Sequence, residues 1–262
     1  MGWMRPLGAT GLRVSALGLG TVKLGRNTGV RYPRPFDLPD DALARSLLDT
    51  ARDGGINLLD TAPAYGCSEE RLGQLLKGQR DDWLICSKVG ERYDAHGSRF
   101  DFSPEHARAS VCASLKRLAT AVIDIVLVHS DGNDLDIIER LGTLQALAEL
   151  KQEGLLRAYG ISTKTLQGGL RAAACCDVVM LTLNLEQREQ AAVAEACAAA
   201  GTGVLVKKPL ASGHLPRGDE SRFLHNSMRL VLGQQGVSAA LVGTLSPSHL
   251  RSDIAAARDV LA

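Results

Sequence analysis

The sequence lacks an excess of charge of either sign. Its 262 residues include 30 basic and 29 acidic side chains, for a formal net charge of +1. Nucleic acids and acidic membranes are bound through clustered positive charge, so this balance indicates neither kind of partner. The chain also has no apolar run of membrane-spanning length and no signal-peptide core near its N-terminus. We therefore expect a cytoplasmic protein, and nothing in the sequence indicates an oligomer.

The cysteines lack the spacing of a metal or redox motif. None of the six follows another at C-x-x-C spacing. The adjacent pair Cys175 and Cys176 cannot easily turn both thiols toward one target, which makes it a poor disulfide and a poor metal site. The others are scattered, at Cys67, Cys86, Cys112 and Cys197. This usage is typical of a protein in a reducing cytosol, and we expect no metal site.

Short apolar runs alternate with segments of helical periodicity along the chain. The runs are apolar on both faces, which indicates parallel strands covered on both sides. We expect strands at 16–20, 56–59, 83–87, 123–128, 157–161, 178–183, 203–206 and 238–242. We expect helices at 40–53, 68–77, 103–118, 134–152, 164–174, 188–200, 221–232 and 246–258. Two of these helices open with Ser-Pro, a cap followed by a first-turn proline.

This alternation predicts a single (β/α)8 TIM barrel of the α/β class over residues 1–262. The length is close to the ~250 residues expected for such a barrel. Length alone also allows two smaller domains, and alternation allows an open doubly wound sheet, but eight similar units favour the closed barrel. Residues 6–20 predict a small β-hairpin that turns at 9–11. The long irregular connection at 25–39 follows the first strand and should lie over the active face.

Four titratable side chains follow neighbouring strands. Asp60 ends the second strand, with Tyr65 in the loop beyond it, and Lys88 and His129 end the third and fourth strands. Taken singly, the acid suits a helix cap, the phenol a packing residue, the amine a solvated side chain and the imidazole a structural histidine. Taken together, these structural alternatives are less convincing, because it is costly to bury titratable groups at the ends of three adjacent strands without a functional reason. In such barrels, chemistry occurs at the carboxyl ends of the strands.

This set of groups suits the reduction of a carbonyl. Hydride arrives at carbon while the oxygen must receive a proton, and a free tyrosine has a pKa of about 10, too high for easy proton traffic near neutrality. A nearby lysine lowers the pKa of the phenol, and a carboxylate keeps that lysine charged despite burial. Histidine can orient the carbonyl oxygen through a hydrogen bond. Tyr65, Lys88, Asp60 and His129 fill these four roles.

The segments around these residues, GINLLDTAPAYG, SKVG and VLVHS, resemble the aldo-keto reductases, whose Asp, Tyr, Lys and His tetrad they match. The opening LGATGLRVSALGLGT resembles the hairpin that closes the barrel floor in this family, together with its first strand. YGIST, KPLASG and LVGTLSPSHL resemble later family segments. The resemblance covers nearly the whole chain. It implies an NAD(P)H-dependent reductase of a small carbonyl compound or sugar, with the cofactor extended across the barrel mouth and no Rossmann fold.

The resemblance assigns cofactor binding to residues at strand ends and in the last helix. These are Gly20, Thr21, Ser162, Thr163, Asn184, Lys208, Leu210, Ser212, Gly243, Thr244, Ser246, His249 and Asp253. The glycine and hydroxyl residues that precede the last helix suit phosphate, because backbone N–H groups at a helix start attract anions.

Several positions on the nicotinamide side depart from the family pattern. Thr163 replaces a usual asparagine, Met180 replaces a common glutamine, and Lys207 stands where an aromatic ring often stacks. We expect Asn184 or Thr163 to help hold the carboxamide.

On the adenosine side, Gly243 and His249 replace the lysine and arginine that grip a 2′-phosphate in many relatives. We expect NADP as the cofactor, with NAD as the alternative.

Two other functions remain open from the sequence. A cofactor-binding sensor or regulatory subunit could keep the tetrad and turn over very slowly, and the altered cofactor positions favour this slightly. An aldolase could instead use Lys88 as a Schiff-base nucleophile. The favoured hypothesis is hydride transfer with Tyr65 as the general acid.

Overall fold

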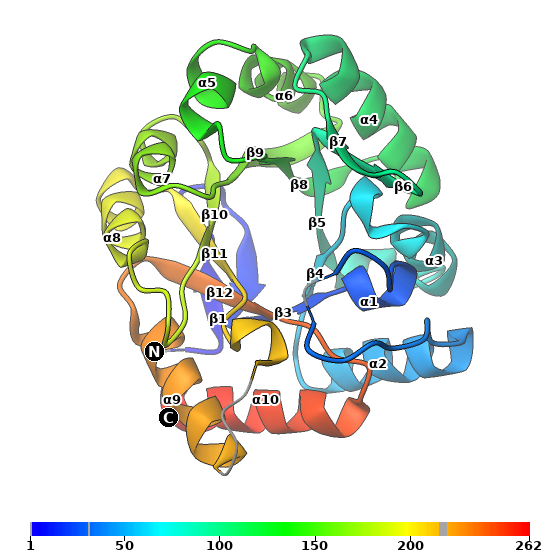
Figure 1. The fold of residues 1–262 in the computed structure, drawn as a ribbon, viewed down its shortest axis with the longest axis vertical. Helices are drawn as coiled ribbons and strands as arrows, with labels where there is room; N and C mark the ends of the chain where they lie inside the picture. The colour runs from blue at the N-terminus through cyan, green and yellow to red at the C-terminus, as the bar shows by residue number, and fades with distance from the viewer. Residues whose placement is uncertain (1, 31, 215–218) are drawn as a thin grey trace.

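The computed structural model describes residues 2–30, 32–214 and 219–262. Within these residues, eight parallel strands form a closed barrel in the order β3-β4-β5-β8-β9-β10-β11-β12, with β12 pairing back onto β3 (Figure 1). Their bounds are β3 Leu17–Gly20, β4 Leu58–Asp60, β5 Leu84–Val89, β8 Ile123–His129, β9 Leu156–Ser162, β10 Val178–Thr182, β11 Gly203–Lys207 and β12 Val237–Val242. The predicted (β/α)8 barrel is confirmed, and each strand overlaps the run of apolar residues that predicted it.

Helices surround the barrel and cover the outer faces of its strands (Figure 1). They are α1 Val22–Gly25, α2 Asp41–Asp53, α3 Ser68–Leu75, α4 Pro104–Arg117, α5 Asp134–Glu139, α6 Thr143–Gln152, α7 Leu166–Ala173, α8 Ala191–Ala200, α9 Glu220–Gly233 and α10 Pro247–Leu261. Short 3-10 turns lie at η1 Pro63–Tyr65, η2 Arg80–Asp82 and η3 Ala211–Gly213. Ser103 and Ser246 cap α4 and α10 as the Ser-Pro pairs predicted, each accepting a backbone N–H with its hydroxyl.

An antiparallel hairpin closes the floor of the barrel, as predicted. Its strands are β1 Met4–Pro6 and β2 Arg13–Ser15. Leu7, Leu12 and Val14 of this segment are buried in the same apolar cluster as the inward-facing strand residues, among them Ile125 and Leu205. Because the floor is filled in this way, the inside of the barrel is a packed core, and ligands can reach the strands only from the opposite end.

The strands approach closely at one glycine. A Cβ atom on Gly160 of β9 would lie 1.7 Å from the carbonyl oxygen of Val178 on β10. Since real side chains never approach a carbonyl that closely, the pairing of these two strands requires glycine at this position.

The segment predicted as one helix at 134–152 is two helices. Gly142 adopts a left-handed conformation, φ 74°, between α5 and α6. Leu141, which lies between the two helices, is 42% exposed, whereas Ile137 of α5 and Leu144 of α6 are buried. The apolar pattern continues across the break because both helices pack on the barrel, but glycine permits a turn that a continuous helix cannot contain.

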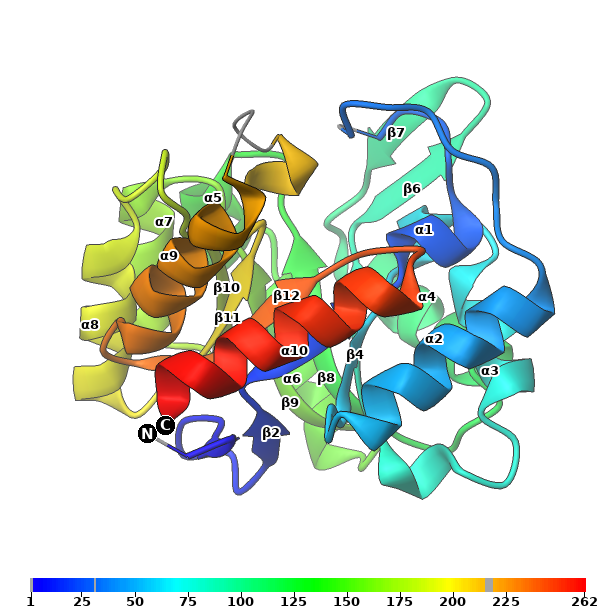
Figure 2. The same ribbon diagram turned by 90° about the horizontal axis from the view of Figure 1, so that it is seen from below.

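A second hairpin, which no pattern in the sequence predicts, lies at the end of the barrel opposite the floor (Figure 2). Its strands are β6 Glu91–Asp94 and β7 Gly97–Phe100, directly after β5. The connection at 25–39 lies beside it at the same end, as expected for a loop over the active face (Figure 2). Arg26 joins the two, because its guanidinium lies 3.2 Å from the centroid of the Tyr93 ring.

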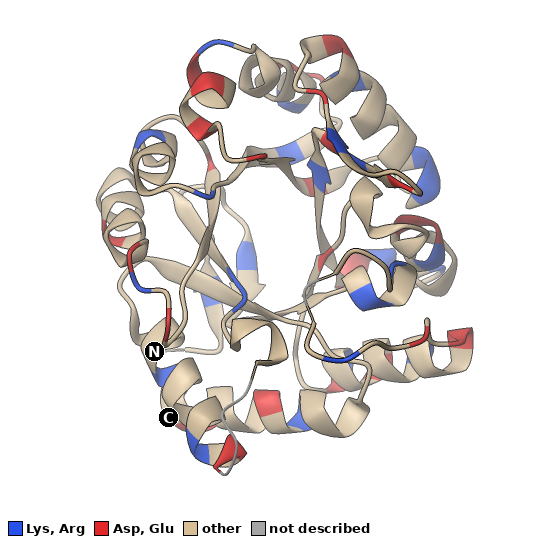
Figure 3. Ribbon diagram, viewed as in Figure 1, with Lys and Arg blue, Asp and Glu red and all other residues tan. Residues whose placement is uncertain are grey.

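Charged residues of both signs are scattered over the elements of the fold (Figure 3). This agrees with the balanced composition. Among the described residues, no helix combines the length and the apolar character needed to cross a membrane.

Candidate active site

The structure brings the four predicted catalytic side chains together at the carboxyl ends of neighbouring strands. Asp60 ends β4, Lys88 lies one residue before the end of β5, and His129 ends β8. Tyr65 closes η1, the turn that follows β4. The order β4-β5-β8 around the barrel explains why these residues meet, since parallel strands deliver their last residues to one rim.

Lys88 and Asp60 form a buried ion pair. The ammonium nitrogen lies 2.6 Å from Asp60 Oδ1, and the two side chains are 2% and 7% exposed. It also donates to the carbonyl oxygen of Thr61 at 2.9 Å. Burial opposes the charge on Lys88, but the Asp60 carboxylate outweighs burial and raises the pKa of the lysine above its usual value. Lys88 therefore carries a fixed positive charge at neutral pH.

Tyr65 lies next to this charge. The Lys88 nitrogen is 4.7 Å from the centroid of the tyrosine ring. Burial raises the pKa of Tyr65 above its usual value, and Lys88 opposes this shift without cancelling it. The lysine thus acts in the expected direction, but burial dominates, so the phenol keeps its proton at neutral pH.

His129 faces Tyr65 edge-to-face, with ring centroids 6.3 Å apart and an interplanar angle of 86°. Its Nδ1 atom lies 2.6 Å from Glu91 Oε2 at the start of β6. Burial lowers the pKa of His129, and Glu91 opposes that shift.

Glu91 also belongs to this cluster, although no sequence pattern predicted it. Its side chain is 10% exposed, and Oε1 accepts a hydrogen bond from the Ser98 hydroxyl at 2.5 Å. Burial alone would raise the pKa of Glu91, but His129 and Ser98 outweigh it and lower the pKa to about 2. The available signal was an acid two residues beyond a buried strand, in a segment whose polar and aromatic residues suit a hairpin.

On the far side of the rim, Ser162 ends β9 and Thr163 follows it, and both residues contact the side chain of the half-buried Lys207. Lys207, the last residue of β11, donates to Ser162 Oγ at 2.7 Å and to the carbonyl oxygen of Thr163 at 2.8 Å. Burial lowers the pKa of Lys207 to about 7.

The Thr163 hydroxyl is fully buried and has no hydrogen-bond partner among the described residues. A buried polar group without a partner is costly, and an amide group of a ligand can satisfy it. The residues at this rim therefore fit a nicotinamide carboxamide.

Two other positions named on the nicotinamide side have structural roles. The side-chain amide of Asn184 donates to the carbonyl oxygen of Lys208 at 3.1 Å. The Oδ1 atom of the same amide accepts hydrogen bonds from the backbone N–H groups of Glu186 and Gln187. This holds the loop after β11, in which Lys208 has a positive φ of 56°. Met180 belongs to the apolar cluster inside the barrel.

The residues predicted for the adenosine end gather around the start of α10. Thr244 Oγ1 accepts the Ser246 N–H at 3.0 Å, and Ser246 Oγ accepts the His249 N–H at 3.3 Å. Asp253, one turn further along α10, is 7% exposed, and burial raises its pKa to about 7. Gly243 precedes them, close to Gly20 at the end of β3.

The other predicted cofactor residues lie on the same end of the barrel. Leu210 and Ser212 belong to the loop after β11, at η3. Thr21 follows β3, and its buried hydroxyl donates to the carbonyl oxygen of Asp60 at 2.9 Å. Thr21 thus supports the end of the strand that carries Asp60. The predicted set as a whole surrounds one rim.

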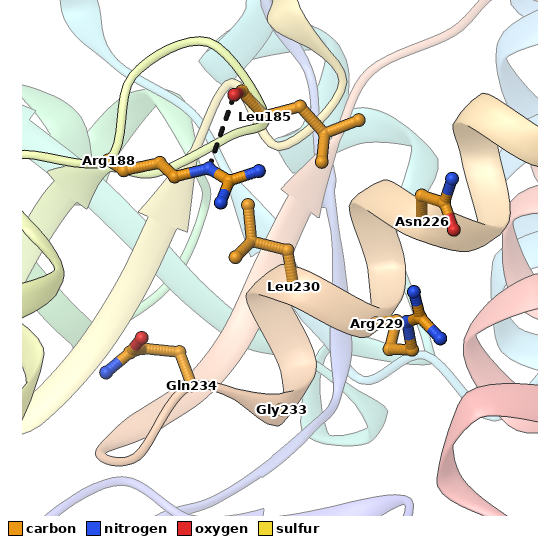
Figure 4. Close-up of a pocket in the computed structure, with 7 residues that line it drawn as sticks. All are labelled: Leu185, Arg188, Asn226, Arg229, Leu230, Gly233 and Gln234. Atoms are coloured by element: carbon orange, nitrogen blue, oxygen red, sulfur yellow. Dashed lines mark hydrogen bonds between the residues drawn. The ribbon is translucent and has the colours of Figure 1, made fainter.

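A separate hollow of about 540 Å³ lies outside the barrel, beside α9. Arg188 and Leu185 line one side of it, with the arginine donating to the carbonyl oxygen of Leu185 at 3.3 Å (Figure 4). Leu230 and Arg229 of α9 line the other side (Figure 4). No predicted site residue is among the residues that line this hollow.

Comparison with known proteins agrees with the geometry of the rim. The family model described as "Aldo/keto reductase family" matches residues 16–231. A crystal structure of a Pseudomonas aeruginosa protein assigned to the aldo-keto reductases is 53% identical, with a TM-score of 0.90 over 99% of this chain and 95% of that one. The holo form of an aldo-keto reductase from Bacillus halodurans is 28% identical, with a TM-score of 0.81 over 97% of this chain and 90% of that one.

Curated relatives include a D-threo-aldose 1-dehydrogenase from a Pseudomonas species. It is 30% identical over 243 residues, which cover 82% of this chain and 71% of the relative. The chain spans about half the length of other curated relatives that it matches, at 48%.

Proposed function

Because the chain belongs to the aldo/keto reductase family, we propose that it transfers hydride between a nicotinamide cofactor and the carbonyl carbon of an aldehyde, ketone or sugar. The observation that carries this proposal is a protonated phenol, Tyr65, held beside the Lys88–Asp60 ion pair. Such a group can deliver a proton to an oxygen that gains negative charge, and the adjacent ammonium stabilises the phenolate that remains.

In the reductive direction, the carbonyl carbon gains the hydride and its oxygen gains the Tyr65 proton, so that an alcohol forms. Lys88 stabilises the negative charge left on the phenol, and Asp60 keeps the lysine charged in a buried place. His129 orients the substrate oxygen. In the oxidative direction the phenolate recovers its proton from the alcohol. Tyr65 is protonated at neutral pH, so the phenol can act as the acid in the reductive direction.

The cofactor supplies the hydride when bound. Ser162 and the unpartnered Thr163 hydroxyl are the groups we assign to its carboxamide. The hydroxyl groups of Thr244 and Ser246 suit its phosphates at the start of α10. We propose NADPH as the cofactor and NADH as the alternative.

We propose small aldehydes, ketones and aldoses as the substrate class. The support is the sugar dehydrogenase among the relatives, together with a rim that offers a proton donor and a histidine to a polar oxygen. Phe36 and Tyr32 of the connection at 25–39 pack edge-to-face, with centroids 5.6 Å apart, and add apolar surface near the same end.

Replacement of Tyr65 by Phe tests the role of the phenol. We expect turnover with a panel of small aldehydes to fall by about 10²–10⁴-fold, the usual contribution of a general acid. Cofactor affinity, measured by calorimetric titration with NADPH and NADH, should stay nearly unchanged, because the hydroxyl alone is removed. Tyr159→Phe on β9 is the matched control, since that ring lies near Asp177 and away from the rim. Unchanged turnover in Tyr65→Phe would refute this mechanism.

The same assay separates the rival functions. A sensor would bind NADPH while the unmodified protein oxidises it negligibly with every aldehyde. An aldolase needs Lys88 as a neutral amine, and the ion pair that raises the pKa of this lysine disfavours that form. Borohydride trapping with a carbonyl ligand should therefore leave Lys88 unmodified.

A further inference from the structure

Glu91 is the feature of the rim that the reaction described above does not use. It comes from β6, outside the barrel wall, and its Oε2 lies 2.6 Å from His129 Nδ1. This nitrogen is buried and makes no hydrogen bond to any other described residue, and the Glu91 carboxylate is the charged group in contact with it. The other carboxylate oxygen is held by Ser98 of β7. The acid is therefore fixed in place by its own hairpin.

A carboxylate beside one ring nitrogen decides what the other nitrogen can do. A carboxylate accepts hydrogen bonds, so the nitrogen next to it carries a proton in the neutral and in the charged imidazole. Only Nε2 of His129 then gains or loses a proton. With the proton, it donates to a carbonyl oxygen; without it, it accepts from the hydroxyl of an alcohol.

We propose that Glu91 is a positioning residue that fixes the His129 proton on Nδ1, so that Nε2 alone titrates and meets the reacting oxygen. This inference rests on the proposed function, in which His129 orients the substrate. The inference adds that the protonation state of His129 Nε2 differs between the complex with a carbonyl compound and the complex with an alcohol.

The charges around His129 show why the acid is needed. Lys88 of β5 and Lys207 of β11 both disfavour a charged imidazole, as does burial, and Tyr65 of η1 presents its ring. Glu91 is the group that opposes them. An opposite charge at this distance typically moves a pKa by about 1–3 units. Removal of the Glu91 charge should therefore lower the pKa of His129 and reduce the carbonyl-binding form at neutral pH.

The hairpin that carries Glu91 is attached to the turn that carries Tyr65. Arg26 donates to the carbonyl oxygen of Ala64 at 3.0 Å and stacks on the ring of Tyr93. The relative positions of the phenol, the imidazole and the acid are thus set by contacts among three segments of the rim.

Glu91→Gln tests the inference because it keeps the shape of the side chain and removes its charge. The first measurement is nitrogen NMR of the histidine rings in the protein without cofactor. The chain has six histidines, so the His129 signals are identified by their loss in His129→Asn. We expect neutral His129 with its proton on Nδ1 in the unmodified protein. In Glu91→Gln its pKa should fall by at least one unit. Glu105→Gln in the first turn of α4 removes one negative charge elsewhere and should leave the His129 signals unchanged.

The second measurement is the pH dependence of kcat/KM for carbonyl reduction and alcohol oxidation. In Glu91→Gln, kcat/KM for carbonyl reduction should begin to fall at a pH at least one unit lower than in the unmodified protein. At pH values above both midpoints, this shift corresponds to an about tenfold lower kcat/KM. Oxidation, which uses the neutral imidazole, should fall less. A purely structural role would lower both directions alike and leave the midpoint in place.

The inference is overturned if His129 titrates alike in Glu91→Gln and in the unmodified protein, or if its neutral form carries the proton on Nε2. These outcomes do not depend on turnover. If no carbonyl is reduced by the unmodified protein, the proposed function fails, while the NMR result still decides whether Glu91 sets the state of His129.

Discussion

Replacement of Asp60 by Asn removes the charge that compensates a buried ammonium and nearly preserves the shape of the side chain. In the variant, Lys88 keeps the carbonyl oxygen of Thr61 but loses the carboxylate at 2.6 Å. Breaking a buried pair by removing one partner costs about 3–5 kcal/mol. One kcal/mol lowers the Tm of a domain near this size by roughly 2–4 °C, so the expected decrease is roughly 6–20 °C.

The pH dependence of this effect has a definite sign. In the unmodified protein Asp60 raises the pKa of Lys88 above its unfolded value, so the stability from its protonation is present at neutral pH and lost as pH rises through the folded pKa. Without the carboxylate, burial lowers the pKa of Lys88 below its unfolded value. Asp60→Asn should therefore regain stability as pH rises from 7 toward 10, because the lysine sheds its proton.

The assay is denaturant unfolding of Asp60→Asn, Lys88→Met and the double variant at pH 7 and pH 9. Lys88→Met leaves an unpaired carboxylate and should also be destabilised. The double variant buries neither charge and should lie closer to the unmodified protein than the sum of the two losses. Additive losses within about 0.5 kcal/mol would refute the reasoning, since they would mean that the two side chains are not coupled.

Two further predictions concern buried charges of the rim. Lys207→Met should raise stability at pH 7 by a few kcal/mol at most, at about 1.4 kcal/mol per pKa unit, because burial lowers the pKa of Lys207 to about 7. The unmodified protein should therefore gain stability between pH 7 and 10 while the variant gains less, in thermal melts across that range; equal slopes would contradict this. Asp253→Asn should stabilise at pH 8 and change little at pH 4. Burial raises the pKa of Asp253 to about 7 in the folded protein, so the unmodified protein loses stability as pH rises from about 4 to about 7. Melts at the two pH values decide it, and a variant that is less stable at pH 8 would show that the carboxylate has a compensating partner.

The barrel could be predicted because its strands bury both faces. A run such as residues 123–128 has no polar side that could suit another architecture, and its neighbours repeat the pattern. The proximity of the candidate site residues followed from the same regularity, since parallel strands deliver their last residues to one rim. Asp60, Lys88 and His129 were therefore predictable as a group without knowledge of their distances.

The features that the sequence did not predict lie outside the apolar core or depend on contacts between distant segments. The hairpin of β6 and β7 packs over the rim and leaves Phe100 exposed, so no apolar periodicity marks it. Glu91 was missed because its importance arises from a neighbour 38 positions along the chain, His129. The break at Gly142 was missed because apolar residues on both sides of it face the barrel. The hydrogen bond from Lys207 to Ser162 joins two strands that are distant in the sequence, and no local pattern indicates it.

Arg26 contacts two separate segments of the rim. Its guanidinium bonds the residue before Tyr65 and stacks on a ring two residues beyond Glu91. A shift of the backbone around Arg26 must carry this guanidinium with it or break these two contacts. The placement of Tyr65 and the placement of the hairpin that carries Glu91 are consequently coupled through a single side chain.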